Sequence, residues 1–355
     1  MSVEGEGAEA KSGNLKLAER SREILAAKPD RAALEALLEE IDARIIGRKL
    51  TPARAPMVFL YQSLVTWLLR GEFVVPWDSR MTARVQFWET EWFNPVLEYQ
   101  RRFVAKAHAE FPLVLGFEVM GRVLNTIPEG TEGFIDDRHK DVTMFRRPGA
   151  KMTIIGFAGL NHQLNGIGWT MFDRAVASKL NANLIVVKDF HRRLYLAGVE
   201  SIGDFNATVA YLREVLTEFA DTRVVTIGGS GGVFAAINFA CELGVDQVVA
   251  TAGPTSLKIG ESSEDKQVYQ KIAADVDAGL IPCPDLVQRV TAAGIRRIDF
   301  FVAGKHAFDY AQMRNLADNC PCVVPHVYED HDGHPVIDRC IADGTLLQAF
   351  NAIGG

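Results

Sequence analysis

The chain has 355 residues, of which 48% are hydrophobic and 23% charged, a balance typical of soluble globular proteins. This length allows one large domain or two ordinary ones. The formal net charge of −7 leaves no excess of cations to neutralise phosphates, which argues against nucleic acid as the main partner. The five cysteines form no CxxC pair, and they indicate reduced thiols in a cytoplasmic protein without a metal site.

The N-terminal third predicts helices. Residues 1–13 are acidic, Gly-rich and poor in apolar residues, so we expect a disordered leader and no secretory signal. Over 14–130, apolar residues recur three and four apart, with Asp30 as the N-cap of one helix. The most apolar run, 55–69, contains Gln62 and is too short to span a bilayer comfortably, so we expect no transmembrane segment. These helices are expected to cap a site or to mediate homo-oligomer formation.

Residues 131–355 alternate short β-branched runs with helical runs. Because the strand runs are apolar throughout, they indicate a parallel sheet covered by helices on both faces. The sequence DVTMFRR predicts an additional edge strand. A long excursion after Ala252 is expected to form a lid or a pocket wall. The six core strands are expected at KMTIIGFAG, ANLIVVKDF, RVVTIGG, DQVVATAG, RIDFFVAG and CVVPHVYE.

A glycine-rich turn joins one of these strands to a helix. Its residues 228–232, GGSGG, fit G-x-S-x-G, a pattern that is meaningful between a strand and a helix. So sharp a turn strains the serine and requires small residues two positions before and after it. Ser230 is thereby presented as a nucleophile, and the N–H of Gly231 as an oxyanion donor. Gly229 suggests room for a bulky group. A phosphate cradle and a plain tight turn remain as alternatives.

From about Lys151 to its end, the chain resembles enzymes of the α/β-hydrolase fold, matched at Gly228, Ser230 and Gly232. More loosely, the turn and its helix resemble small hydrolase-like domains found beside polysaccharide biosynthesis enzymes. The resemblance implies an α/β class, with a mostly parallel sheet preceded by a helical region. It further implies a serine hydrolase, esterase- or thioesterase-like, that uses a Ser-His-Asp triad and a covalent acyl-enzyme on a small or acyl-carrying substrate, without a cofactor. An acyltransferase, a non-catalytic binding or assembly protein and a nucleotide-binding protein are the alternatives.

In this superfamily the nucleophile precedes the acid, and the acid precedes the histidine. His334 fits as the base, because it stands in a loop after the last strand and just before the final helix. His331 is the alternative, whereas His326 lies within a strand and is expected to be packed.

The acid is expected at the end of the strand RIDFFVAG. Asp309 is the first carboxylate after it, although Asp309 could instead cap a helix that starts there. Asp330 and Asp332 are further alternatives, both close to the histidine loop.

Other site residues are expected at the ends of the first two core strands. The second oxyanion donor is expected to be the N–H of Ala158 or Gly159. Asn161, Asp189 and Arg192 could contact substrate, Arg192 through a carboxylate or phosphate group. A loop residue, a helix cap and a surface arginine are equally good interpretations of the three.

Overall fold

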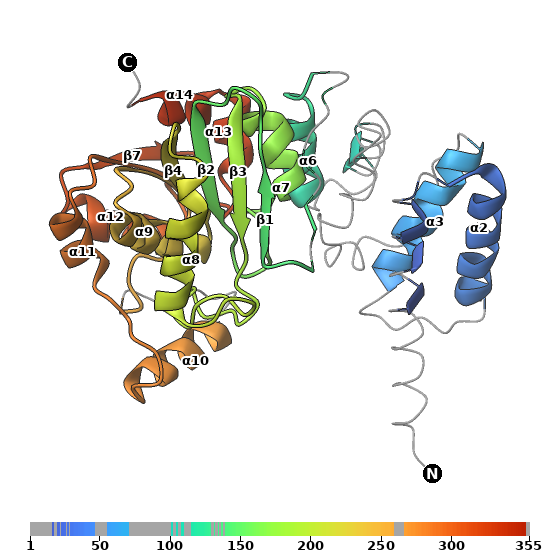
Figure 1. The fold of residues 1–355 in the computed structure, drawn as a ribbon. Helices are drawn as coiled ribbons and strands as arrows, with labels where there is room; N and C mark the ends of the chain where they lie inside the picture. Colours follow the sequence, from blue (N-terminus) through green and yellow to red (C-terminus); the bar gives the residue numbers. More distant parts are fainter. Residues whose placement is uncertain are drawn as a thin grey trace, which may run out of the picture. The chain divides into compact units, whose positions relative to one another are not determined.

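The computed structural model describes residues 139–258 and 266–352 continuously. Before these it describes 29–46, 55–70 and 115–128, together with single residues and short stretches between 16 and 137. The expected leader at 1–13 lies outside the described residues. The chain divides into two compact units, Met1–Gly130 and Thr131–Gly355 (Figure 1).

The first unit is helical in the residues described. Its longer helices are α2 (Arg31–Ile46), α3 (Ala55–Arg70) and α6 (Leu115–Leu124), and α2 packs against α3. The Asp30 carboxylate accepts a hydrogen bond from the N–H of Ala33 at 2.9 Å, which confirms the predicted cap. None of the helices described in either unit has both the length and the apolar character needed to cross a bilayer.

The second unit is built on a seven-stranded sheet with the order β1-β3-β2-β4-β5-β6-β7. The edge strand β1 runs antiparallel to β3, and the other neighbours are parallel. All six predicted core strands and the predicted edge strand are present, so the expected α/β class with a mostly parallel sheet is confirmed. The strands are β1 (Val142–Phe145), β2 (Met152–Phe157), β3 (Ala182–Val187), β4 (Arg223–Gly229), β5 (Gln247–Thr251), β6 (Arg297–Ala303) and β7 (Val323–Tyr328).

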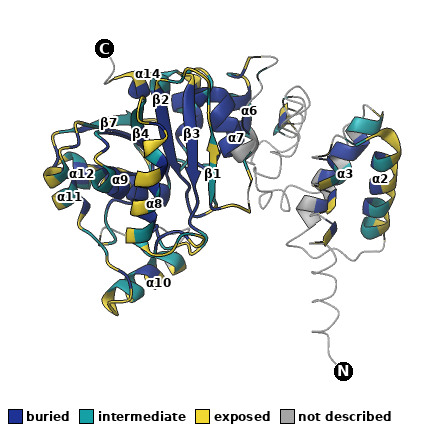
Figure 2. Ribbon diagram, in the orientation of Figure 1, coloured by how far each residue is buried: buried dark blue, intermediate teal, exposed yellow. Residues whose placement is uncertain are grey.

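Helices cover both faces of this sheet. Successive strand residues point to opposite sides, and β2 and β3 are buried at every position, so both of their faces are packed. Phe157 on β2 stacks on Phe239 at 5.0 Å, on the face covered by α8, α9, α11 and α12. Gly156, one residue earlier, faces Trp169, and an added Cβ there would lie 2.3 Å from the indole. Figure 2 shows β2 and β3 in dark blue, as fully buried strands of the sheet. The helices are α7 (Trp169–Phe172, continued by a π-helical turn), α8 (Phe205–Thr217), α9 (Gly232–Leu243), α10 (Lys266–Asp277), α11 (Leu286–Ala293), α12 (Ala307–Ala317), α13 (Ile337–Ala342) and α14 (Thr345–Asn351).

Candidate active site

Ser230 lies between β4 and the N-cap residue of α9, in a strained backbone conformation. Its φ is +51°, a left-handed value that L-residues other than glycine rarely adopt. Its N–H is held by the carbonyl oxygens of Thr251 and Ala252, at 3.1 and 2.8 Å. The end of β5 therefore fixes the turn, and the strain is maintained by the surrounding structure.

The glycines of the turn have no room for side chains. A Cβ on Gly228 would lie 2.1 Å from the Gly232 oxygen, and one on Gly232 would lie 2.0 Å from the Phe157 oxygen. The bare position at Gly229 had suggested space for a bulky group, and this interpretation is wrong. A Cβ on Gly229 would lie 2.7 Å from the backbone nitrogen of Asn165, so the position is bare because another loop packs against it.

The N–H of Gly231 is free to bind an anion. Gly231 is the N-cap residue of α9, where exposed N–H groups and the helix dipole favour negative charge. Among the described residues, its N–H donates to no acceptor. The side chain of Leu160 lies against it, since a Cβ on Gly231 would come within 3.1 Å of Leu160 Cγ. The turn after β2 and the start of α9 are thus in contact.

Both N–H groups that the sequence offered as the second oxyanion donor are already engaged. Ala158 donates to the oxygen of Val187 at 3.0 Å, and Gly159 donates to the oxygen of Gln163 at 2.8 Å. The next residue, Leu160, donates to no acceptor in the described part of the chain. Of these three consecutive N–H groups, that of Leu160 is therefore the one without an acceptor among the described residues. The loop after β2 folds back on itself, and this could not be derived from the sequence.

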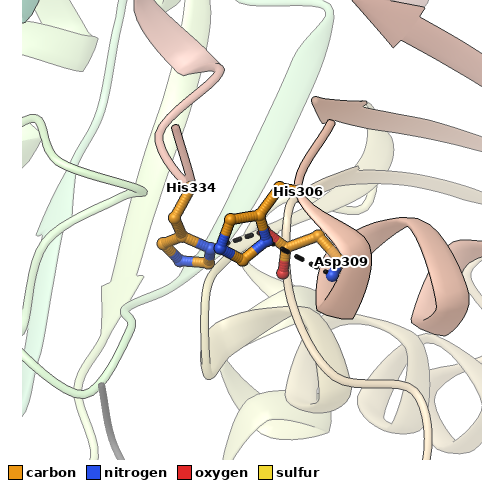
Figure 3. Close-up of side chains that lie close together, drawn as sticks. All are labelled: His306, Asp309 and His334. Atoms are coloured by element: carbon orange, nitrogen blue, oxygen red, sulfur yellow. Dashed lines mark hydrogen bonds and ion pairs between the residues drawn. The ribbon is translucent and has the colours of Figure 1, made fainter. Parts of the chain in front are cut away.

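His334 and Asp309 are brought together. Nδ1 of His334 lies 2.7 Å from Oδ2 of Asp309, although the two residues are 25 positions apart (Figure 3). His334 comes from the loop between β7 and α13, and Asp309 from the first turn of α12. An ionised carboxylate can only accept, so Nδ1 carries the hydrogen and Nε2 keeps the lone pair. This is the tautomer in which a histidine acts as a base at Nε2.

The Asp309 carboxylate is fully buried and remains charged. Burial is the largest single influence and would raise its pKa, but the hydrogen bonds and charges of His306 and His334 together outweigh it, and the pKa lies below its usual value. The alternative that Asp309 caps a helix is wrong, because α12 begins earlier, at Ala307.

His306 is the member of this cluster that the sequence did not single out. Its Nδ1 lies 2.6 Å from the same Oδ2 of Asp309 that His334 contacts (Figure 3). His306 and Asp309 are three residues apart across the first turn of α12, so this spacing was the signal that could have paired them.

The other histidines near the carboxyl ends of the strands have structural partners. His326 stacks on Phe301 at 4.3 Å and bonds to the Asp299 carboxylate at 2.8 Å, which confirms it as a packed residue. The ring of His331 bonds to the oxygen of Pro335 at 2.7 Å and stabilises the loop that carries His334. Asp330 is exposed and lies 4.0 Å from Lys305.

Asn165 links the serine turn to the histidine loop. Its Oδ1 accepts hydrogen bonds from the N–H groups of Val336 and Ile337, at 2.8 and 3.3 Å, just after His334. The backbone of Asn165 packs on Gly229, as described above. Among the described residues no hydrogen bond joins Ser230 to His334, whereas Asn165 contacts both segments. Nothing in the local pattern of the sequence marked it.

The three residues expected to contact substrate occupy different environments. Asp189 is 4% exposed, and its Oδ2 accepts the N–H groups of Arg193 and Tyr195, so it holds the loop after β3. Burial, the largest effect, raises the pKa of Asp189. Arg192 is exposed on that loop, and Asn161 is exposed beside the turn after β2. The residues after Asp189 form a loop and no helix, so Asp189 holds that loop and does not cap a helix.

The excursion after β5 lines a cavity. A space of about 640 Å³ lies between residues 255–258, α10 and the start of α11. Its first lining residue, Thr255, follows Gly253 closely in the chain. Gly253 packs against the Ser230 backbone, since an added Cβ at Gly253 would be 2.1 Å from the oxygen of Ser230. Part of the excursion, 259–265, is outside the described residues.

His306, Asp309 and His334 also each present a donor atom, all within 4.8 Å of one another. In the described part of the chain these are the side chains close enough to share a metal ion. The two short hydrogen bonds to Oδ2 account for the arrangement without one.

No protein-family model matches the sequence, and neither does any curated protein. Solved structures resemble the fold. A carboxylesterase of the thaumarchaeon Nitrososphaera gargenis is 11% identical, with 60% of this chain and 93% of that chain covered and a TM-score of 0.40. An S-formylglutathione hydrolase of Agrobacterium tumefaciens is 14% identical, with 59% of this chain and 88% of that chain covered and a TM-score of 0.41. The capsule O-acetyltransferase of Neisseria meningitidis serogroup A is 11% identical, with 64% of this chain and 99% of that chain covered and a TM-score of 0.43. At these identities the likenesses concern the fold alone.

Proposed function

We propose that this chain is a serine hydrolase of the esterase or thioesterase type, with Ser230, His334 and Asp309 as its catalytic triad. The observation that carries the proposal is the 2.7 Å bond between His334 and the buried, ionised Asp309, which stabilises the tautomer that a general base needs. The strained φ of Ser230 supports its role as a nucleophile at a sharp strand–helix turn.

The chemistry runs in two halves. In the first, Nε2 of His334 removes the Ser230 proton while Oγ attacks the acyl carbonyl carbon, and the imidazolium then gives that proton to the leaving group. In the second, His334 removes a proton from water, and the resulting attack releases the acid and restores Ser230. The buried negative charge of Asp309 stabilises the imidazolium in both halves.

The oxyanion of each tetrahedral intermediate would be bound by two backbone N–H groups. Gly231 supplies one at the start of α9, and Leu160 supplies the other from the turn after β2. Two observations support this pair: neither N–H has an acceptor among the described residues, and Leu160 lies against Gly231.

The experiment measures hydrolysis of p-nitrophenyl acetate and of a short acyl thioester. Ser230→Ala and His334→Ala should each lower kcat/KM by at least about 1000-fold, and Asp309→Asn by a similar factor, because members of a triad act together. His326→Gln is the matched control, since it removes a histidine with a structural partner, and it should retain activity. Equal rates for wild type and Ser230→Ala would contradict the proposal. Transfer of the acyl group to an added alcohol or amine in preference to water would identify an acyltransferase on the same triad.

A further inference from the structure

The Asp309 carboxylate is shared between two histidines from different segments. His306 lies 2.6 Å from Oδ2, and His334 lies 2.7 Å from the same oxygen. Oδ1 is buried and has no partner in the described part of the chain. Both imidazoles are about one quarter exposed, at 26% and 24%, whereas the carboxylate is fully buried between them. Figure 3 shows the side chains of His306, Asp309 and His334 close together.

The protonation of His306 follows from its shortest contact. Its Nδ1 is 2.6 Å from the carboxylate oxygen and 3.4 Å from the backbone nitrogen of Asp309. One nitrogen cannot donate to the first and accept from the second, and the charge-assisted bond to a carboxylate is the stronger. His306 therefore donates Nδ1–H to Oδ2, in parallel with His334.

We propose that His306 is a positioning residue that holds the Asp309 carboxylate in the orientation used by His334. The proposal rests on the proposed function. With His306 absent, Oδ2 would keep a single hydrogen bond and Oδ1 none, so the buried carboxylate could rotate away from His334.

Other charged groups lie on the neighbouring segments. Lys305 precedes His306 and pairs with Asp330 at 4.0 Å, while Glu329 packs against Gly304 and His331 accepts the N–H of Lys305 through its backbone oxygen. All of them are unchanged in the variants below, so differences among the variants report the bond from His306.

The test compares His306→Ala with His306→Asn in the full chain. Asparagine can place an N–H close to the position of Nδ1 and is also a good N-cap, whereas alanine does neither. Asp204→Ala is the matched control, because it removes the N-cap of α8, whose side chain accepts from Ala207 at 2.8 Å, away from the cluster. Each variant is checked by circular dichroism and thermal unfolding before its kinetics are measured.

His306→Ala should lower kcat by about 10- to 100-fold with little change in KM. His306→Asn should recover most of the lost kcat, and Asp204→Ala should change only the unfolding temperature. Wild-type kinetics in His306→Ala would overturn the proposal, as would equal defects in the Ala and Asn variants.

A second readout separates this proposal from the proposed function. In the inactive Ser230→Ala background, proton NMR detects the two hydrogen-bonded Nδ1–H groups at low field. His306→Ala should remove one signal and shift the remaining one, even if the protein hydrolyses no ester. An unshifted His334 signal would contradict the shared carboxylate, whereas absence of activity in the wild type with the expected NMR result would contradict only the function.

Discussion

Ser230 is a residue held in a conformation that it would not adopt on its own. Its φ of +51° costs a residue with a Cβ roughly 1–2 kcal/mol relative to glycine. The surrounding hydrogen bonds from the turn to Thr251 and Ala252 maintain this strain. A strained serine that is only partly buried is the arrangement expected where function outweighs local stability.

The strain predicts different stabilities for two variants that lack the Ser230 hydroxyl. Ser230→Gly should be more stable than Ser230→Ala by about 1 kcal/mol, because glycine adopts a positive φ without the steric cost. Urea unfolding of both proteins measures the difference. If Ser230→Gly were equally or less stable, the backbone at Ser230 would not be strained.

The close packing around Gly229 predicts that a side chain at this position lowers stability. Gly229→Ala should lower stability by about 1–3 kcal/mol and reduce kcat, because the new methyl group would meet backbone and Cβ atoms of Asn165. Gly121→Ala adds the same group in α6, where its nearest neighbour, Val104, is 3.6 Å away, and should be tolerated. Urea unfolding and ester hydrolysis report both variants. Tolerance of alanine at both positions would contradict the close packing of Asn165 on the turn.

At the scale of elements, the site is assembled from segments that follow β2, β4, β6 and β7. The carboxyl ends of parallel strands meet at one edge of a sheet, which is where ligands bind in such folds. Asn165 couples two of these segments, since it packs on Gly229 and accepts the N–H of Val336. The position of the histidine relative to the serine thus depends on a residue that contributes no reacting atom.

Replacing this residue tests the coupling. Asn165 has a φ of +46°, so Asn165→Gly keeps the backbone conformation and removes the acceptor. We expect kcat to fall about 10- to 100-fold with a smaller change in KM, because the histidine loop is misplaced. Asn165→Asp, which retains an acceptor oxygen, should keep more activity.

Asn181→Gly is the matched control, because Asn181 has the same φ of +46° and is exposed away from the cluster. It should leave kcat unchanged. Equal activity in Asn165→Gly and Asn181→Gly, measured by ester hydrolysis, would show that Asn165 has no part in aligning the site.

At the scale of the whole molecule, the sequence predicted the sheet well because its strands are short, apolar and separated by helical runs. β4 and β5 are examples whose burial on both faces follows from continuous β-branched residues. The sequence could not predict that the loop after β2 occupies the N–H of Gly159 through Gln163, because such a bond depends on a non-repetitive turn. It also missed His306, since the start of α12 was placed at Asp309.

The charge state of the cluster predicts the pH dependence of activity. The pKa of Asp309 lies below its usual 3.8, so its stabilising charge is present above that value and is lost only as the pH falls through the lower folded-state pKa. Protonation of Asp309 should therefore not contribute to the acid limb of kcat/KM at pH values above 3.8. Stopped assays with circular dichroism at each pH check this. A limb of slope two, or one that coincides with unfolding, would contradict it.

The central claim is that His334 and Asp309 activate the hydroxyl of Ser230. Labelling with a fluorophosphonate, followed by peptide mass spectrometry, tests it most directly, because the probe bonds to an activated serine and leaves ordinary surface serines unmodified. The account predicts one adduct per chain, on the peptide that contains Ser230, no adduct in Ser230→Ala, and strongly slowed labelling in His334→Ala. A folded wild-type protein that stays unlabelled, or an adduct on another residue, would contradict it.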